Sequence, residues 1–215
     1  MLFGDSFAGQ YEPFWDIVGT QLKINIQSIT TNWCYPSISD GFTGRVTSKA
    51  YEQCKFNRRY FENSLKDFDF VIFGGQWADV IKKQKFNEVL EIINIAAADE
   101  EKLVIIMPSP ELFIKRSLKN YIYRPSIENT LVNSVKEQHA AIANKRLSDE
   151  ANNFENVFFL ERHSIFRNSG LPSALTNDNL PYPSDGSHIS IYGAKKAAET
   201  FLQTDTFERI NMFMN

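Results

Sequence analysis

Phe68-Asp69-Phe70-Val71-Ile72-Phe73-Gly74-Gly75 is the stretch of the chain that most clearly decides its fold. Residues 68–73, which are apolar except for Asp69, are the most hydrophobic strand candidate, and such a stretch is typical of a strand buried on both faces of a sheet. The two glycines end the strand and let the backbone approach a ligand closely. We therefore expect a buried strand here, with a tight turn at its carboxyl end.

Helix-like segments lie on both sides of this strand, and further strands follow. Residues 48–65 carry apolar positions at helical spacing, formed by Tyr51, Cys54, Phe61 and Leu65. The other expected elements are a strand over 22–29, a helix over 79–98, a strand over 103–107, a long polar helix over 127–151, a strand over 157–160 and a helix over 193–202. Strands separated by helices predict an α/β fold, a three-layer α/β/α sandwich with a central parallel sheet.

Two long stretches, residues 30–47 and residues 161–191, are predicted to be loops. Long ordered loops inside a compact domain are usually functional. In open α/β sheets, ligands bind beyond the carboxyl ends of the strands. We therefore expect functional residues directly after strands and in these two loops.

The composition is that of one ordinary globular domain. The chain has 215 residues, of which 43% are hydrophobic and 23% charged, and its formal net charge is -3. This size predicts a single domain over residues 1–215. The negative charge disfavours a nucleic-acid partner, and no apolar run approaches the ~20 residues that span a bilayer. Since no HExxH pattern, Cys/His cluster or phosphate-binding glycine motif occurs, no metal and no cofactor are expected.

The amino-terminal end starts abruptly. Met1-Leu2-Phe3 leads directly into Gly4-Asp5-Ser6 with no signal peptide. A catalytic turn normally follows a strand of about five residues, and here only a short one precedes it. We therefore expect the chain to be a fragment of a longer protein.

The chain has two cysteines, Cys34 and Cys54, whose spacing matches no metal-binding pattern. They are either two buried free thiols or a disulfide that closes the intervening loop, and we favour the disulfide. It would stabilise the fold by about 3 kcal/mol on the chain-entropy model and would indicate an oxidising compartment.

Gly4-Asp5-Ser6 is the first candidate for chemistry, since it follows a short strand and precedes an expected helix. A backbone N–H at a helix start stabilises negative charge. That position suits a nucleophilic serine whose own N–H helps to hold an oxyanion. Taken alone, however, the tripeptide is better explained as a helix cap, because Asp and Ser are both good N-cap residues.

Asp185-Gly186-Ser187-His188, in the second long loop, is the next candidate. A nucleophilic serine needs a base, and the base needs a carboxylate to orient it. Asp185 and His188 are close enough in the chain to serve together, although such a pair alone is also common in ordinary loops. The other two histidines, His139 and His163, lie in polar or charged stretches that favour solvated surface positions.

Gly74-Gly75-Gln76-Trp77 is the third candidate. An N–H group of this turn and the Gln76 side-chain amide could both donate to an oxyanion, and Trp77 could contact a sugar ring or an acyl group. The alternative is a tight turn with Trp77 in the core. The three candidates are distant in the sequence but fall on one edge of the predicted sheet, and this coincidence favours a shared site.

The set resembles the SGNH hydrolase superfamily, also called GDSL-like, nearly from end to end. The first family block, Gly-Asp-Ser, matches residues 4–6, and the last, Asp-x-x-His, matches residues 185–188. The resemblance implies the flavodoxin-like SGNH fold and a catalytic triad with Ser6 as nucleophile, His188 as base and Asp185 as the orienting acid.

The middle blocks depart from that family pattern. The family's Gly-x-Asn-Asp block, whose Asn lies in the oxyanion hole, is replaced here by Gly-Gly-Gln-Trp-Ala-Asp over residues 74–79. The oxyanion candidates are therefore Ser6, Gly44, Gly75, Gln76 and Asn57. Candidates for sugar contacts are Trp77, Trp33 and Tyr182, and core packing is an equal alternative for each of these three.

These departures resemble one subgroup, the SGNH domains fused to membrane-bound acyltransferase-3 proteins that O-acetylate bacterial surface polysaccharides. The matching features are Cys34-Tyr35-Pro36, then Cys54 with Asn57, and a strand that leads to Trp77. This resemblance implies a periplasmic domain tethered to the inner membrane, and a Cys34–Cys54 disulfide would be reasonable there. It also implies an acyl donor delivered by the membrane domain, with the isolated domain a monomer.

The expected activity is acyl transfer. Ser6 would form an acetyl-enzyme, and a hydroxyl group of a polysaccharide sugar would then accept the acetyl group. Two alternatives stay open: a carbohydrate acetylesterase, in which water is the acceptor, and a non-catalytic glycan-binding module that keeps the fold.

Overall fold

A computed structural model describes residues 1–110, 135–185 and 187–214 of the chain. Its contacts divide the chain into two compact units, each made of several segments. The first unit comprises Met1–Gly9, Ile26–Ser109 and His139–Leu160, and the second comprises Gln10–Asn25, Pro110–Gln138 and Glu161–Asn215. The expectation of a single domain over residues 1–215 stays a prediction.

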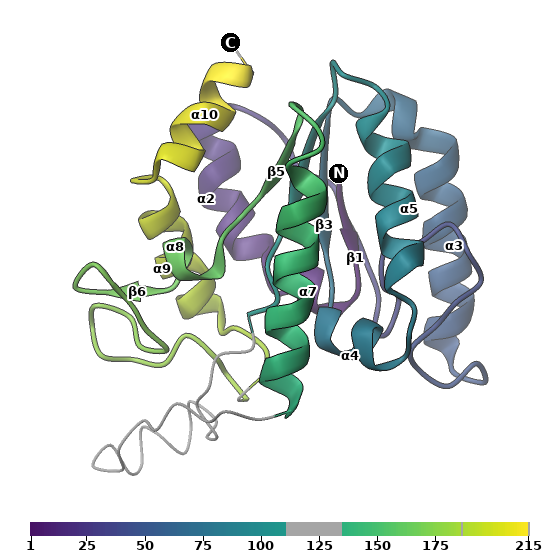
Figure 1. Cartoon of the computed structure of the whole chain (residues 1–215), viewed down its shortest axis with the longest axis horizontal. Helices are drawn as coiled ribbons and strands as arrows, with labels where there is room; N and C mark the ends of the chain where they lie inside the picture. The colour runs from purple at the N-terminus through teal and green to yellow at the C-terminus, as the bar shows by residue number, and fades with distance from the viewer. Residues whose placement is uncertain (111–134, 186, 215) are drawn as a thin grey trace. The chain divides into compact units, whose positions relative to one another are not determined.

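The first unit contains a parallel sheet of five strands in the order β2-β1-β3-β4-β5 (Figure 1). The strands are β1 (Leu2–Gly4), β2 (Ser28–Thr30), β3 (Phe70–Gly74), β4 (Leu103–Ile106) and β5 (Val157–Phe159). This is the flavodoxin-like order, in which the chain reverses its direction of travel across the sheet between β1 and β3. The predicted α/β fold with a central parallel sheet is thus confirmed.

Both faces of the sheet are buried, as the continuous apolar strands predict. Phe3, Val71 and Val104 face one side together with Phe61, and they are at most 1% exposed. Leu2, Ile72 and Ile105 alternate to the other side and are fully buried as well. The centre of the sheet therefore forms the core, and only its edges can offer polar sites.

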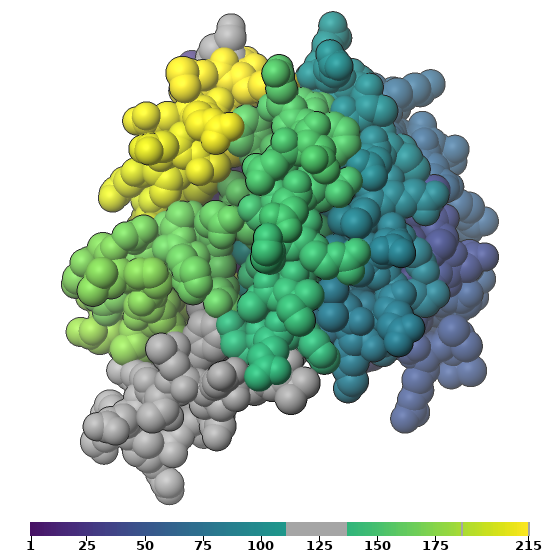
Figure 2. Space-filling view, viewed as in Figure 1, coloured from purple at the N-terminus to yellow at the C-terminus, as the bar shows by residue number. Residues whose placement is uncertain are grey.

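The helices of the first unit flank this sheet. They are α1 (Ser6–Gly9), α3 (Lys49–Ser64), α4 (Trp77–Lys82), α5 (Phe86–Ala97) and most of α7 (Val135–Ala151), with the short 3-10 helix η1 (Leu65–Asp67) after α3. Figure 2 shows the atoms of α5 and α7 in contact on the viewed face. Arg146 of α7 lies over the Phe86 ring, 4.3 Å from its centroid, and donates to Asn87.

The second unit consists of helices and a small hairpin. Its elements are α2 (Glu12–Leu22), α8 (Arg162–Ile165), the antiparallel strands β6 (Arg167–Asn168) and β7 (Leu171–Pro172), α9 (Ile191–Phe201) and α10 (Asp205–Phe213). Helices α2 and α9 pack together, with the Phe14 and Phe201 rings 5.4 Å apart. Every helix among the described residues is too short or too polar to cross a membrane.

Several predicted boundaries were wrong. The strand predicted over 22–29 is mostly not a strand, because α2 runs to Leu22, Lys23 adopts a left-handed conformation and β2 begins only at Ser28. The helix predicted over 79–98 is two helices, α4 and α5, separated at Gln84, which has φ 58°. The helix predicted over 127–151 is described only from Val135, and its earlier part lies outside the described residues.

Candidate active site

In the first unit, the turn that follows β1 is hydrogen-bonded to the turn that follows β3. Gly4 pairs with Gly74 in the sheet register. The next residue after β1, Asp5, is 2% exposed, and its carboxylate accepts hydrogen bonds from the N–H groups of Phe7 (2.8 Å) and Gln76 (2.9 Å). Asp5 therefore fixes the turn after β1 to the turn after β3.

Gly4 is required by this close approach. It has φ +154°, and a Cβ atom there would lie 1.8 Å from the Gly74 carbonyl oxygen and 2.8 Å from the Ala8 Cβ. No side chain fits that space. The glycine of the Gly4-Asp5-Ser6 motif thus lets α1 pack directly onto the ends of two strands.

Ser6 is the first residue of α1 and is half-buried. Asp5, not Ser6, has the capping role, because its carboxylate accepts from Phe7 and its carbonyl accepts from Ala8 (3.0 Å) and Gly9 (3.1 Å). The helix-cap interpretation is therefore right for Asp5. The Ser6 side chain is not needed as the cap, and a chemical role stays compatible with its position.

The turn after β3 contains two backbone N–H groups, those of Gly75 and Gln76, that are candidates to donate to an oxyanion. The Gln76 N–H is taken by Asp5. The Gly75 N–H is buried, and no residue that the structure describes accepts a hydrogen bond from it. Since buried N–H groups are rarely left unpaired, Gly75 is the better backbone oxyanion donor of the two.

Asn57 lies over the same end of β1. Its neighbour one turn later on α3, Phe61, stacks on Phe3 of β1 with the ring centroids 4.8 Å apart. The start of α3 lies at the carboxyl edge, since Cys54 is bonded to Cys34 in the loop that follows β2. Asn57, between Cys54 and Phe61, is therefore placed above the residues that follow Phe3.

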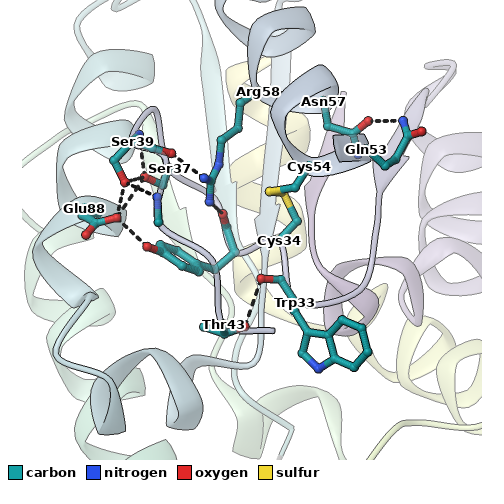
Figure 3. Close-up of a disulfide and its surroundings, with 12 residues drawn as sticks. Trp33, Cys34, Ser37, Ser39, Thr43, Gln53, Cys54, Asn57, Arg58 and Glu88 are labelled. Carbon is teal, nitrogen blue, oxygen red and sulfur yellow. Dashed lines mark hydrogen bonds between the residues drawn. A yellow bond between two sulfur atoms is a disulfide. The ribbon is translucent and has the colours of Figure 1, made fainter. Parts of the chain in front are cut away.

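The two polar atoms of the Asn57 side chain, Oδ1 and Nδ2, differ in their hydrogen bonds. It is 2% exposed, and its Oδ1 accepts a hydrogen bond from Gln53 Nε2 at 2.7 Å (Figure 3). Its Nδ2 is buried and has no partner among the described residues. A buried amide donor without a partner is costly, so a bound ligand is a reasonable acceptor for it.

The second unit brings Asp185 and His188 together as the sequence predicts. Asp185 Oδ2 lies 2.9 Å from His188 Nδ1, and Oδ1 accepts from the N–H groups of Ser187 (2.8 Å) and His188 (2.7 Å). Partial burial opposes ionisation of Asp185, but the hydrogen bonds from His188 and Ser187 prevail and lower its pKa. Asp185 is thus an anionic acceptor that holds the imidazole by Nδ1, and this leaves Nε2 as the ring nitrogen for proton transfer.

Neighbouring residues of the second unit hold this pair in place. The Ile189 N–H donates to Gln10 Oε1 at 2.7 Å, and Ser184 N–H donates to the His188 carbonyl at 2.6 Å. Ser190 begins α9, and its hydroxyl accepts from the Gly193 N–H at 2.9 Å. His163, in contrast, is exposed as predicted, and His139 is half-buried.

Ser6 belongs to the first unit, whereas Asp185 and His188 belong to the second. The carboxylate–imidazole half of the predicted triad is therefore described as a contact, and the participation of Ser6 stays a prediction.

The first long loop is closed by a disulfide between Cys34 and Cys54, which confirms that expectation (Figure 3). Both cysteines are fully buried. Gly44, an oxyanion candidate, lies in this loop against an aromatic ring, since a Cβ atom there would be 2.8 Å from Trp33 Cγ. That contact explains Gly44 as a packing position.

Two charged residues that the sequence does not predict as functional anchor the same loop. Arg58 is buried and donates to the carbonyls of Tyr35 (3.0 Å) and Ser39 (Figure 3). Glu88 accepts from the hydroxyls of Tyr35 (2.5 Å) and Ser39 and from Lys85 (2.8 Å). Partial burial opposes ionisation of Glu88, yet these bonds lower its pKa to about 2. No sequence pattern marks such long-range partners.

The three aromatic candidates for sugar contacts differ in exposure. Trp77 is fully buried, and its indole N–H donates to the Met107 carbonyl at 2.8 Å. Tyr182 is 1% exposed, and its hydroxyl donates to the Arg167 carbonyl at 2.8 Å. Both fit the core-packing alternative. Trp33 is 44% exposed.

Comparisons with known proteins agree with this architecture. No curated protein is similar enough in sequence to match. Among solved structures, the periplasmic domain of a lipopolysaccharide acetyltransferase from Salmonella ser. Paratyphi A has a similar fold, with a TM-score of 0.62 and 13% sequence identity over 92% of this chain and 79% of that one. A family model described as "SGNH domain (fused to AT3 domains)" matches residues 1–203. The chain therefore belongs to the family of SGNH domains that are fused to AT3 domains.

Proposed function

We propose that this chain is a serine-dependent O-acyltransferase that moves an acetyl group onto a sugar of a bacterial surface polysaccharide. The observation that carries the proposal is the Asp185–His188 contact of 2.9 Å in a member of the SGNH family. An anionic carboxylate on Nδ1 fixes the imidazole tautomer whose Nε2 can accept a proton. The similar fold of a lipopolysaccharide acetyltransferase domain supports an acyl-related activity on polysaccharide.

In the proposed mechanism, Ser6 Oγ attacks the acetyl carbonyl carbon of the donor while His188 Nε2 takes the hydroxyl proton. The tetrahedral intermediate collapses, and the leaving group of the donor departs with that proton. A sugar hydroxyl then attacks the acetyl-enzyme, with His188 again as the base. Ser6 is regenerated and the sugar carries the acetyl ester. The match to the family model, which covers both residues, supports the pairing of Ser6 with His188.

For the oxyanion hole we propose the N–H groups of Ser6 and Gly75 and the Nδ2 group of Asn57. Gly75 and Asn57 each carry a buried donor for which the described residues provide no acceptor, and both belong to the carboxyl edge of β1 and β3. Preorganised donors of this kind are typically worth a factor of about 10² to 10³ in kcat each. The Gln76 side-chain amide is a further candidate, and its backbone N–H is used by Asp5.

We place the domain outside the cytoplasm, tethered in the full-length protein to a membrane acyltransferase domain that supplies the acyl donor. The family model names a fusion to AT3 domains, and the similar structure is a periplasmic domain. A buried disulfide is consistent with an oxidising compartment.

A serine-directed organophosphate tests the catalytic claim. We expect stoichiometric labelling of the wild-type protein, detected as a mass increase on the peptide that contains Ser6. The Ser6→Ala variant should not be labelled, and Ser48→Ala, which changes another half-buried serine of the same unit, should be labelled normally. Equal labelling of wild type and Ser6→Ala would contradict a nucleophilic Ser6 and would favour the glycan-binding alternative.

An experiment that distinguishes an acetyltransferase from an acetylesterase must include a polysaccharide acceptor. The wild-type protein is supplied with an activated acetyl ester and increasing amounts of a de-O-acetylated surface polysaccharide. Transfer predicts acetylated polysaccharide that increases as free acetate decreases. Free acetate alone at every acceptor concentration would establish the esterase instead.

A further inference from the structure

Trp33 differs from the other two tryptophans of the chain in exposure. Its side chain is 44% exposed, whereas Trp15 and Trp77 are 1% and 0% exposed. An exposed indole loses the stabilisation that burial of a large aromatic side chain provides. The fold therefore gains little from this side chain at its surface position.

The backbone of Trp33 is held in a conformation that bulky residues rarely adopt. Its φ is 62°, in the left-handed region. Thr43 binds the Trp33 carbonyl twice, with its N–H (3.1 Å) and its hydroxyl (2.9 Å), and the next residue, Cys34, is bonded to Cys54 (Figure 3). Strained positions that neighbours enforce in this way are concentrated at ligand clamps and active sites.

One side of the indole is supported by its own loop. Gly44 lies so close that a Cβ atom there would be 2.8 Å from Trp33 Cγ and Cδ2. Phe42 meets the indole edge-on, with the ring centroids 6.4 Å apart, and itself contacts Tyr51 at 5.3 Å. The ring is thus supported on one side, and the residue is still 44% exposed.

The loop that carries Trp33 starts at the edge that holds Ser6. Thr30, the last residue of β2, pairs with Gly4, and the Thr31 N–H donates to the Gly4 carbonyl at 3.2 Å. Trp33 follows Thr30 by three residues, and Ser6 follows Gly4 by two. Both leave adjacent parallel strands in the same direction, so they share the carboxyl edge of the first unit.

We infer that Trp33 is a stacking platform for a pyranose ring of the acceptor glycan, at a subsite separate from the sugar that is acetylated. The inference rests on the proposed function for the identity of the ligand. An indole face offers a flat apolar surface and its N–H a polar one, which suits the apolar faces and hydroxyls of a sugar. Stacking on a fixed ring also needs little ordering on binding.

The test uses the fluorescence of the chain's three tryptophans. Since only Trp33 is substantially exposed, acrylamide should quench one class of fluorescence strongly, and this class should be missing in Trp33→Phe. The probe is surface polysaccharide from the cells that naturally produce this protein, and its O-acetyl groups are removed with mild base. We expect it to protect the quenchable class, and calorimetry should show that Trp33→Ala raises the dissociation constant at least about tenfold.

Two further variants sharpen the result. Gly44→Ala keeps the indole but pushes it from its support, so it should also raise the dissociation constant. Phe56→Ala removes a different exposed aromatic side chain, which is 56% exposed on α3, and should leave binding unchanged. Near-ultraviolet circular dichroism and thermal unfolding check that each variant is folded.

Equal polysaccharide affinity of wild type and Trp33→Ala, or no protection of the quenchable class in wild type, would overturn the platform. Organophosphate labelling of Ser6 in the wild-type protein keeps this outcome apart from the proposed function. If Ser6 is labelled but Trp33 is irrelevant to binding, only the platform fails. If Ser6 is not labelled, the enzyme claim fails by itself.

Discussion

The two long loops within the described residues are held in opposite ways. The disulfide loop, residues 31–48, is fixed by groups outside it, namely Cys54, Arg58 and Glu88. The histidine loop, residues 166–190, is closed mainly by its own hydrogen bonds, including Tyr182 N–H to Ala174 O (3.0 Å) and Thr176 N–H to Leu180 O (2.8 Å).

This difference predicts that changes in one loop mainly affect stability and that changes in the other mainly affect activity. Anchors on α3 and α5 make the disulfide loop part of the folded core, so its loss should be measured as a loss of stability. Short-range hydrogen bonds join Asp185 to His188 in the histidine loop, so alteration of this loop should be measured mainly as a loss of activity.

The largest effect is expected in the histidine loop. Asp185→Asn should lower kcat for an activated acetyl ester by about 10⁴, because an amide does not hold the imidazole in the required tautomer. The free energy of unfolding should change far less, since the carboxylate is half exposed. His188→Ala should give a similar loss, and the double variant should lose little more. A decrease of less than tenfold in Asp185→Asn would show that this pair is not the catalytic dyad.

The disulfide loop should show the reverse. Replacing both Cys34 and Cys54 by Ser should lower the free energy of unfolding by about 3 kcal/mol, because the closed loop spans 20 residues of sequence separation. Urea denaturation measures this loss, and reduction of the wild-type protein should reproduce it. We also expect weaker polysaccharide binding, since Cys34 adjoins Trp33. An unchanged urea midpoint would mean that Arg58 and Glu88 hold the loop without the disulfide.

Glu88 gives the disulfide loop a predicted pH dependence. Its pKa is lowered from 4.5 to about 2, so its contribution to stability is present above pH 4.5 and is lost as the pH falls through about 2. Glu88→Gln should therefore be less stable than wild type by about 1.5 kcal/mol at pH 7, after allowance for solvent screening. The difference should disappear near pH 2. Thermal unfolding between pH 2 and pH 7 measures it, and a constant difference would contradict an anionic anchor.

The sequence predicted the parts of this molecule that depend on local pattern. Apolar runs marked the strands β3, β4 and β5, and the helical spacing of apolar residues marked α3 and α9. The strand predicted over residues 22–29 is wrong because the alternation of apolar and polar residues that predicts it continues from the last residue of α2 into the segment before β2. The helix over 79–98 was read as continuous because nothing in its composition marks the left-handed break at Gln84.

The candidate site was predictable where one chemical pattern defined it. Asp185 and His188 lie three residues apart, so their contact needed no knowledge of the fold. The roles of Gly75 and Asn57 depend on which buried donors are already bonded, and only coordinates show that. The exposed position of Trp33 and the buried positions of Trp77 and Tyr182 depend likewise on tertiary packing, and similar aromatic residues were indistinguishable in sequence.

The smallest expected effect concerns two helix N-caps, Ser190 of α9 and Thr204 of α10, of which only Ser190 lies close in the chain to the proposed catalytic base. Ser190→Ala removes the hydroxyl that accepts from the Gly193 N–H at 2.9 Å, and Thr204→Ala removes the cap of α10, which accepts from Phe207 at 3.2 Å. Each should cost about 1 kcal/mol of unfolding free energy. Because Ser190 follows His188 by two residues and its hydroxyl also donates to the Tyr182 carbonyl at 3.0 Å, only Ser190→Ala should also lower kcat, by a few fold. Equal kcat values for the two variants would show that the histidine loop keeps its geometry without the cap, and its own turns would then be sufficient to hold the base.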